Sequence, residues 1–178
     1  IASGANKMQT IKAFEEAERH EGPSIIIAYT PCISHGLKGG MSETLREAKE
    51  AVACGYWQLY RYNPNLEELG KNPLTLDFKK PDFDKMTEFM TQQVRFASLQ
   101  RIKPEAAQAL FDKTTADARR KFVRYARMSG DLDKFLAKEA KAKGEQPVLV
   151  TSVKVERPKR EKDPEAEARR AAKRAERA

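Results

Sequence analysis

Residues 24–29 constrain the fold more than any other stretch, because they are apolar at consecutive positions and end at a glycine-rich turn. The run SIIIAY leads through Pro31 into Cys32, and three glycines follow within the next eight residues. A strand that is apolar on both faces is typical of a parallel sheet, whose two faces are covered by helices. The sequence therefore predicts a buried parallel strand over 24–29, followed by a turn suited to binding.

The segments around this strand alternate between helical and extended patterns. Over 6–20, apolar residues recur at helical spacing with charges between them, and they comprise Met8, Ile11, Phe14 and Ala17. A second amphipathic helix is expected from Ser42 to Cys54, and the aromatic run YWQLYRY over 56–62 predicts a second strand. The order helix, strand, helix, strand indicates an α/β domain with a parallel sheet.

The second half of the chain has mostly helical patterns. Residues 71–81 predict a short extended piece between two prolines, and 82–98 predict a helix. Pro104 opens a long helix that a Ser-Gly pair ends, and a brief helical stretch is expected over 132–143. Beyond it, PVLVTSVKVE favours a strand. The remaining residues are rich in Ala, Arg, Glu and Lys, which predicts disorder or a solvated helix.

Three regions are expected from these patterns: an α/β part over 1–100, a helical extension over 101–145 and a basic tail over 146–178. The formal net charge is +8, and the last 25 residues contribute half of it, with ten Lys or Arg against six Asp or Glu. The body of the chain is therefore only mildly basic. Charge alone gives weak evidence that the fold itself binds nucleic acid.

Cysteine usage and hydropathy indicate a cytoplasmic setting. Two cysteines in 178 residues do not form a disulfide framework, which points to a reducing compartment. No apolar run approaches the ~20 residues that a membrane-spanning helix needs, and the first residues do not resemble a signal peptide. Because the sequence begins with Ile1 rather than methionine, we expect a processed product or a piece of something longer.

Cys32 lies three residues beyond the carboxyl end of the predicted strand, which is where parallel sheets bind their ligands. Four interpretations of this thiol stay open from the residues alone. In the first, the thiol packs like a small apolar side chain and has no function. In the second, it is a nucleophile activated by His35, although no third orienting residue is evident. With His35 it binds zinc, in which case only Cys54 and His20 remain to complete the site. Finally, it is one thiolate of an iron–sulfur cluster whose other ligands lie elsewhere.

Four islands of sequence favour the last interpretation. They are GANK at 4–7, AYTPCISHG at 28–36, GYWQLYRYNP at 55–64 and GKNPLTLD at 70–77. In this order and spacing they resemble the C-terminal part of pyruvate:ferredoxin (flavodoxin) oxidoreductase. The resemblance covers residues 1–100 in detail, and it becomes weaker towards residue 130.

The resemblance implies a fold and an activity. Residues 1–100 look like the C-terminal part of the parallel-sheet domain that binds thiamine diphosphate and Mg²⁺. The family decarboxylates pyruvate oxidatively to acetyl-CoA and CO₂. Its electrons pass through [4Fe–4S] clusters to ferredoxin or flavodoxin, and the complete enzyme is a homodimer. These implications make pyruvate, coenzyme A and an electron carrier the expected partners, with no membrane involved.

The resemblance also assigns a role to Cys32. In the family, the cysteine of the matching Tyr-x-Pro-Cys island is a ligand of the [4Fe–4S] cluster nearest the thiamine, so Cys32 is expected to bind that cluster. The other three ligands and the thiamine motif are expected upstream. No catalytic residue is therefore expected in this chain, and a fragment of this extent is expected to be inactive by itself.

A second hypothesis comes from a different class of function. The chain would be a small basic protein that binds nucleic acid or an acidic partner through its tail, while the α/β body is only structural. The mildly basic body makes nucleic acid the less favoured partner.

Overall fold

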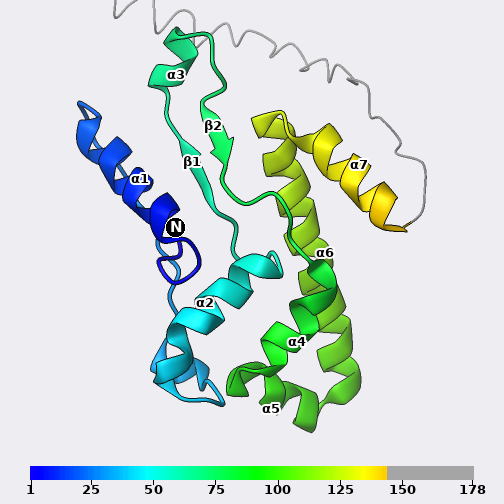
Figure 1. Cartoon of the computed structure of the whole chain (residues 1–178). Coiled ribbons are helices and arrows are strands. Elements are labelled where there is room, and N and C mark those ends of the chain that lie inside the picture. Colours follow the sequence, from blue (N-terminus) through cyan, green and yellow to red (C-terminus); the bar gives the residue numbers. More distant parts are fainter. Residues whose placement is uncertain (144–178) are drawn as a thin grey trace, which may run out of the picture. The chain divides into compact units, whose positions relative to one another are not determined.

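The computed structural model describes residues 1–143, which belong to one compact unit (Figure 1). The strand expected over 147–156 and the predicted tail lie outside the described residues, and the predicted division between 100 and 101 stays a prediction. The helices are α1 Lys7–Arg19, α2 Thr44–Ala53, α3 Asn65–Glu68, α4 Met86–Thr91, α5 Val94–Ile102, α6 Pro104–Ser129 and α7 Leu132–Lys143. The strands are β1 Tyr60–Tyr62 and β2 Leu74–Leu76, and short 3-10 turns cover Ile33–His35, Met41–Glu43 and Phe83–Lys85.

The sheet within 1–143 is small and antiparallel, so the described chain combines helices and strands but is mostly helical. β1 pairs with β2 in the register Tyr60↔Leu76 and Tyr62↔Leu74. The parallel pairing expected for the aromatic run over 56–62 is therefore not found there, and only its last three residues form a strand. Gly55, at φ 79°, turns the chain before Tyr56, whose ring packs against Phe89 at 5.1 Å between centroids.

Residues 24–29 are extended but are not assigned to a strand, contrary to the expectation from their sequence. Among the described residues, the backbone hydrogen bonds found for this segment run to Ile1, which bonds to Ile27 and Tyr29. The side chains of Ile25 and Ile27 are 87% and 61% exposed. A parallel strand forms only beside neighbours that supply its hydrogen bonds, and one residue does not make a ladder.

The helices of the second half agree closely with the sequence pattern. The long helix α6 begins at Pro104, as expected, and ends where Gly130 adopts φ 76°, while α7 covers the stretch predicted to follow it. The helix expected over 82–98 is instead broken between α4 and α5, because Gln93 is extended at φ −95° and ψ 127°. α2 begins two residues after the expected cap, since the hydroxyl of Ser42 donates to the carbonyl of Gly39.

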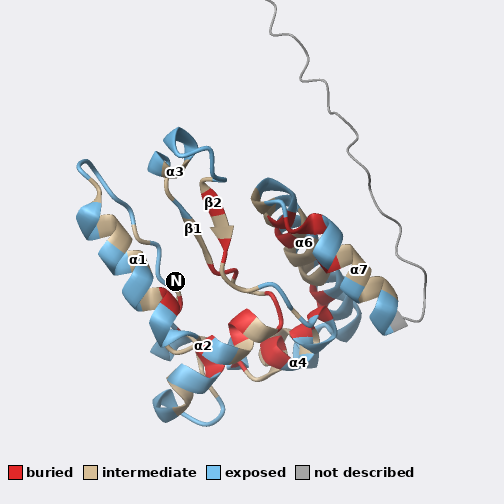
Figure 2. Cartoon of the chain, turned by 45° about the horizontal axis from the view of Figure 1, so that its top comes forward, coloured by how far each residue is buried: buried red, intermediate tan, exposed pale blue. Residues whose placement is uncertain are grey.

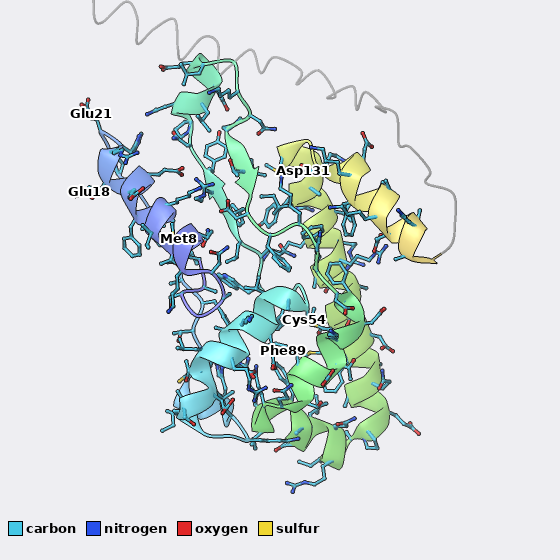
Figure 3. The ribbon with its side chains drawn as sticks, viewed as in Figure 1. Met8, Glu18, Glu21, Cys54, Phe89 and Asp131 are labelled. Atoms are coloured by element: carbon cyan, nitrogen blue, oxygen red, sulfur yellow. The ribbon has the colours of Figure 1, made fainter. Side chains whose placement is uncertain are left out.

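The main core lies where α2, α4, α6 and α7 meet β2. Its largest fully buried side chains include Phe89, Phe122, Leu76, Met86, Met90 and Cys54. Figure 3 shows Cys54, directly after α2, near Phe89 on α4, and Figure 2 shows buried positions on α2 and α4. No helix among residues 1–143 is both long enough and apolar enough to cross a membrane.

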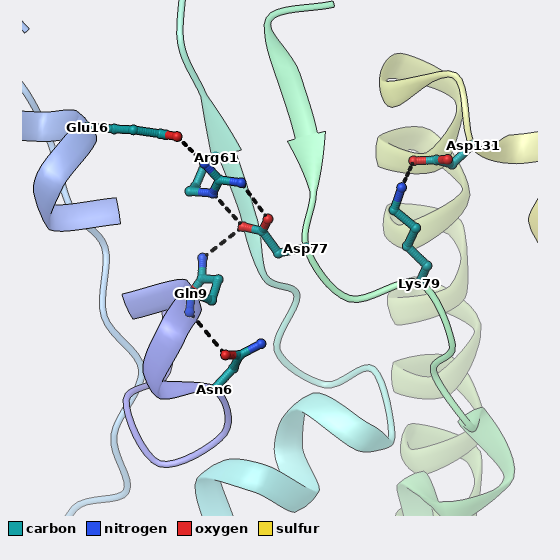
Figure 4. Close-up of polar contacts among 7 residues, drawn as sticks. All are labelled: Asn6, Gln9, Glu16, Arg61, Asp77, Lys79 and Asp131. Carbon is teal, nitrogen blue, oxygen red and sulfur yellow. Dashed lines mark hydrogen bonds and ion pairs between the residues drawn. The ribbon is translucent and has the colours of Figure 1, made fainter. Parts of the chain in front are cut away.

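Helix α1 is attached to this unit mainly by polar contacts. Arg61 on β1 forms a two-point ion pair with Asp77, at 2.9 Å for both bonds, and it also pairs with Glu16 on α1 (Figure 4). The side chain of Gln9 donates to Asp77 at 3.0 Å. By contrast, the apolar stripe of α1 stays exposed, and Met8 is 63% accessible. This stripe therefore has no partner among the described residues.

Replacing a core phenylalanine should show which helix face holds the unit together. Phe122 is 1% exposed and its ring contacts Phe135, whereas Leu110 on the same helix is 49% exposed. We expect Phe122→Ala to lower the free energy of unfolding by about 3–5 kcal/mol. The control Leu110→Ala should change it by less than about 0.5 kcal/mol. Chemical unfolding of both variants checks this, and similar losses would contradict the assigned core.

Candidate functional site

Cys32 is the exposed thiol at the end of the extended segment 24–31. The buried Pro31 precedes it, and Cys32 itself caps the 3-10 turn Ile33–His35 with extended backbone angles of φ −113° and ψ 154°. This geometry places the sulfur outside the core at the point where the chain reverses. Cys32 was expected three residues beyond the carboxyl end of a parallel strand, and within residues 1–143 the run before it is extended but is not part of a sheet.

The surroundings of the Cys32 sulfur favour its charged form. Hydrogen bonds from the backbone N–H and then the side chain of Ser34 lower the pKa of the thiol, and the N–H of Ile33 adds to this effect. Slight desolvation opposes them. Because the thiolate is the form that binds metals and attacks electrophiles, this turn prepares Cys32 for either role.

His35 is held by the backbone and not by the thiol. Its Nδ1 accepts the N–H of Cys32 at 3.3 Å, so this nitrogen carries no proton in that contact. Burial lowers the pKa of the imidazole, and the nearby charge of Arg95 lowers it further. The structure therefore uses His35 to close the 3-10 turn. This arrangement gives no support to the interpretation of His35 as the base of a cysteine nucleophile.

The zinc interpretation also lacks a ligand set in the described part of the chain. Within 1–143, no three His, Cys, Asp or Glu side chains gather closely enough to hold a metal ion by themselves. Cys54 is 2% exposed, and its Sγ donates to the carbonyl of Ala51 at 3.5 Å. Burial raises the pKa of the Cys54 thiol to about 11, which keeps it protonated as a packed core side chain.

The glycine-rich turn after Cys32 is fastened to the start of α5. The carbonyl of Gly36 accepts the N–H of Val94 at 2.8 Å, and Leu37 forms an antiparallel bridge with Gln93. Gly36 adopts φ 65°, and a Cβ built on it would lie 2.8 Å from the Cβ of Val94. A glycine is therefore required here for two reasons, its backbone angle and its close contact with α5.

Gln93 connects the turn after Cys32 to the buried core, and this role was not predicted from the sequence. Its side chain is completely buried, donates to Glu47 on α2 at 2.6 Å and accepts from Arg95 at 2.8 Å. Burial raises the pKa of Glu47, and the hydrogen bond from Gln93 opposes this rise. A glutamine inside a predicted helix gives no signal of such a role, because the pattern reports only which face is apolar.

The site fits one ligand position of a [4Fe–4S] cluster and not a whole cluster. Such a cluster normally takes four cysteine thiolates. Cys32 offers an exposed sulfur whose charged form is stabilised, while Cys54 is buried in the core. Any remaining ligands must come from outside residues 1–143. The described residues present no arrangement to which thiamine diphosphate or Mg²⁺ can be assigned, so no step through them is derived.

Comparison with known proteins shows which enzymes the matched part of the chain resembles, and it leaves the role of Cys32 untested. No protein-family model matches the chain. The chain is 48% identical over 131 residues to a pyruvate-flavodoxin oxidoreductase of Klebsiella pneumoniae, and 46% identical over 129 residues to a pyruvate:ferredoxin oxidoreductase of Moorella thermoacetica. It is also 41% identical over 126 residues to a mitochondrial NADP(+) pyruvate dehydrogenase of Euglena gracilis.

The matched part of the chain is related to pyruvate-flavodoxin and pyruvate:ferredoxin oxidoreductases. The three matches cover 74%, 72% and 71% of this chain. They cover only 11%, 11% and 7% of the respective relatives, so the chain spans about a tenth of the length of the oxidoreductases that it matches. The family resemblance read from the four islands is thereby confirmed for this segment.

The close contact at Gly36 gives a prediction about the turn. Gly36→Ala meets both an unfavourable φ of 65° and the Cβ of Val94, whereas Gly40→Ala meets only an unfavourable φ of 78°. We expect Gly36→Ala to destabilise the chain by at least about 1 kcal/mol more than Gly40→Ala, since it adds overpacking to backbone strain. Thermal and chemical unfolding of the two variants measure this difference. Equal losses would mean that the turn is not fastened to α5.

The hydroxyl of Ser34 gives a prediction about the thiol. Ser34→Ala removes one of the hydrogen bonds that lower the pKa of Cys32, so the pKa should rise and less thiolate should be present near neutral pH. The rate of alkylation by iodoacetamide should then fall at pH 7, and its pH midpoint should move upwards. Ser42→Ala is the matched control, because the Ser42 hydroxyl bonds to Gly39 instead. A Ser34→Ala variant that reacts like the control contradicts the assignment.

Proposed function

We propose that this chain is a C-terminal segment of a pyruvate:ferredoxin or pyruvate:flavodoxin oxidoreductase. The single observation that carries the proposal is the match of 131 residues at 48% identity to a pyruvate-flavodoxin oxidoreductase. The whole protein would convert pyruvate and coenzyme A to acetyl-CoA and CO₂ and pass the electrons to ferredoxin or flavodoxin. The segment by itself would be inactive, since it supplies only part of the machinery.

Within that enzyme, Cys32 is proposed as a thiolate ligand of the [4Fe–4S] cluster nearest the thiamine. A cluster of this kind transfers single electrons when it is bound. Three features of this chain support the role: the sulfur is exposed, hydrogen bonds from Ser34 and Ile33 stabilise its charge, and the turn beyond it is fastened to α5. Cys32 would hold one corner of the cluster, while Gln93 and Val94 keep the turn in place.

The finer parts of the proposal concern cofactors, partners and the domain. Residues 1–100 would complete the parallel-sheet domain that binds thiamine diphosphate and Mg²⁺, residues 101–145 would extend it with helices, and the chain would act in a cytoplasmic homodimer. The apolar run over 24–29 supports the sheet, because its pattern suits a strand enclosed on both faces. The two unpaired cysteines support a reducing compartment.

The second hypothesis, a basic binding protein that acts through its tail, gains no support from the relatives. Their names describe pyruvate oxidoreductases and a pyruvate dehydrogenase. The alternative also leaves the stabilised thiolate of Cys32 without a role. The oxidoreductase proposal accounts for both observations.

The role of Cys32 is tested in the complete oxidoreductase that contains this segment. Cys32→Ser should remove one thiolate, so the bound iron should fall by up to one cluster per chain and electron transfer to ferredoxin should slow by at least about tenfold. Iron analysis, electron paramagnetic resonance and ferredoxin reduction provide the three readouts.

The matched control is Cys54→Ala, which removes the other cysteine from the buried core. We expect this variant to keep its full iron content, even where packing loss lowers its stability. A Cys32→Ser enzyme with unchanged iron and an unchanged rate of ferredoxin reduction would refute the role. Loss of iron in both variants would show a general folding defect and would equally withdraw support from a specific ligand.

A further inference from the structure

A groove of about 520 Å³ opens between helix α1, the extended residues 24–27 and strand β1. Its walls combine apolar and aromatic side chains, among them Ile25, Ile27, Trp57 and Tyr60. Ile25 and Ile27 are largely exposed here, although isoleucine is among the residues that are most often buried. The groove therefore exposes isoleucine side chains that no segment of residues 1–143 covers, beside polar residues such as Glu16 and Arg61.

The backbone of Ile1 shows what kind of partner fits this groove. The terminal ammonium of Ile1, which stands where a longer polypeptide has a peptide N–H, donates to the carbonyl of Ile27 at 2.8 Å, and the carbonyl of Ile1 accepts the N–H of Tyr29 at 3.0 Å. In a parallel ladder, one residue bonds to the two residues that flank the residue opposite it. Here Ile1 bonds to Ile27 and Tyr29, which flank Ala28. Ile1 thus occupies the place of a single residue of a parallel strand, and the groove continues along Ser24–Ile27 from that place.

Two further groups in the groove lack hydrogen-bond partners. Gln58 is only 8% exposed, its Nε2 donates to Ala118, and its Oε1 is buried without a donor. The Nδ1 of His20 is buried in the same way. Both residues line the groove. A buried acceptor without a donor costs free energy, so the Gln58 oxygen favours an occupant that carries N–H groups, as a peptide backbone does.

The length of the relatives indicates where such a backbone comes from. Because the chain spans about a tenth of the oxidoreductases that it matches, most of a polypeptide of that kind lies outside these residues. From the parallel contacts of Ile1, we infer that the residues leading into Ile1 in the longer polypeptide form a strand that fills the groove parallel to residues 24–28. This inference rests on the proposed function, since it requires the longer polypeptide.

The ladder fixes the register of the inferred strand. If the pattern of Ile1 continues, the N–H of Ile27 donates to the carbonyl of the residue two positions before Ile1. The N–H of Ile25 then donates to the carbonyl of the residue four positions before Ile1. The N–H of Ile26 faces the opposite edge. The strand would also bury the groove walls, which explains why a run of three isoleucines lies at a surface in residues 1–143.

Residue-resolved hydrogen exchange tests this inference on the 178-residue chain and on the longer encoded oxidoreductase. We expect the amides of Ile25 and Ile27 to exchange on the order of 100-fold more slowly in the longer polypeptide, because they become bonded in a ladder. The amides of Leu69 and Gly70 are matched controls, since they bond to Leu66 and Glu67 within the chain. Their exchange should be the same in both proteins.

A second preparation covers the case in which the longer polypeptide does not fold. The 178-residue chain, extended by its own ten or so preceding encoded residues, should show the same protection of Ile25 and Ile27. An extension of equal length made of glycine and serine is its control and should leave these amides unprotected. Protection by both extensions, or by neither, overturns the inference.

Two more outcomes would contradict it. Equal exchange of Ile25 and Ile27 in the 178-residue chain and the longer polypeptide would show that no strand enters the groove. Protection already present in the 178-residue chain, together with the mass of a dimer, would make a second copy the occupant. The iron content of Cys32→Ser, measured on the same longer polypeptide, reports the proposed function separately, so either idea can fail without the other.

Discussion

The side-chain amide of Gln93 lies where α2, the start of α5 and the turn after Cys32 meet. This amide donates to Glu47 and accepts from Arg95, and the backbone of the same residue forms the bridge to Leu37. A buried amide that loses a partner leaves a costly unsatisfied group, so these contacts favour one arrangement of the three segments. The position of Cys32 therefore depends on the helical core. The glycines of the turn after it contribute only the backbone conformations that this position requires.

The other side of the unit, around α1 and residues 24–29, lacks comparable apolar support. Glu16 of α1 pairs with Arg61 and Gln9 of α1 donates to Asp77, while Met8 and Ile25 expose their apolar side chains. Extended apolar surface of this kind marks a contact with another segment or molecule. A polypeptide several times longer, as in the matched oxidoreductases, offers such segments. The same explanation accounts for an isoleucine-rich run that has the composition of an enclosed strand and almost no neighbours.

The features that sequence predicted well are those that local patterns determine. The limits of α6 and α7 follow from Pro104, Gly130 and helical periodicity. The break before α5 was missed because glutamine is an ordinary helix former, and the break at Gln93 is stabilised by Glu47 from a distant helix. The strand over 24–29 was not found because β-pairing needs partners far away in the chain.

The central claim is that Cys32 binds iron, and anomalous diffraction at the iron absorption edge from crystals of the complete oxidoreductase tests it most directly. The account predicts an iron peak within bonding distance of the Cys32 sulfur, with three further thiolates from other parts of the polypeptide around the same cluster. A complete cluster bound by four other residues, with the Cys32 sulfur free in solvent, would contradict it.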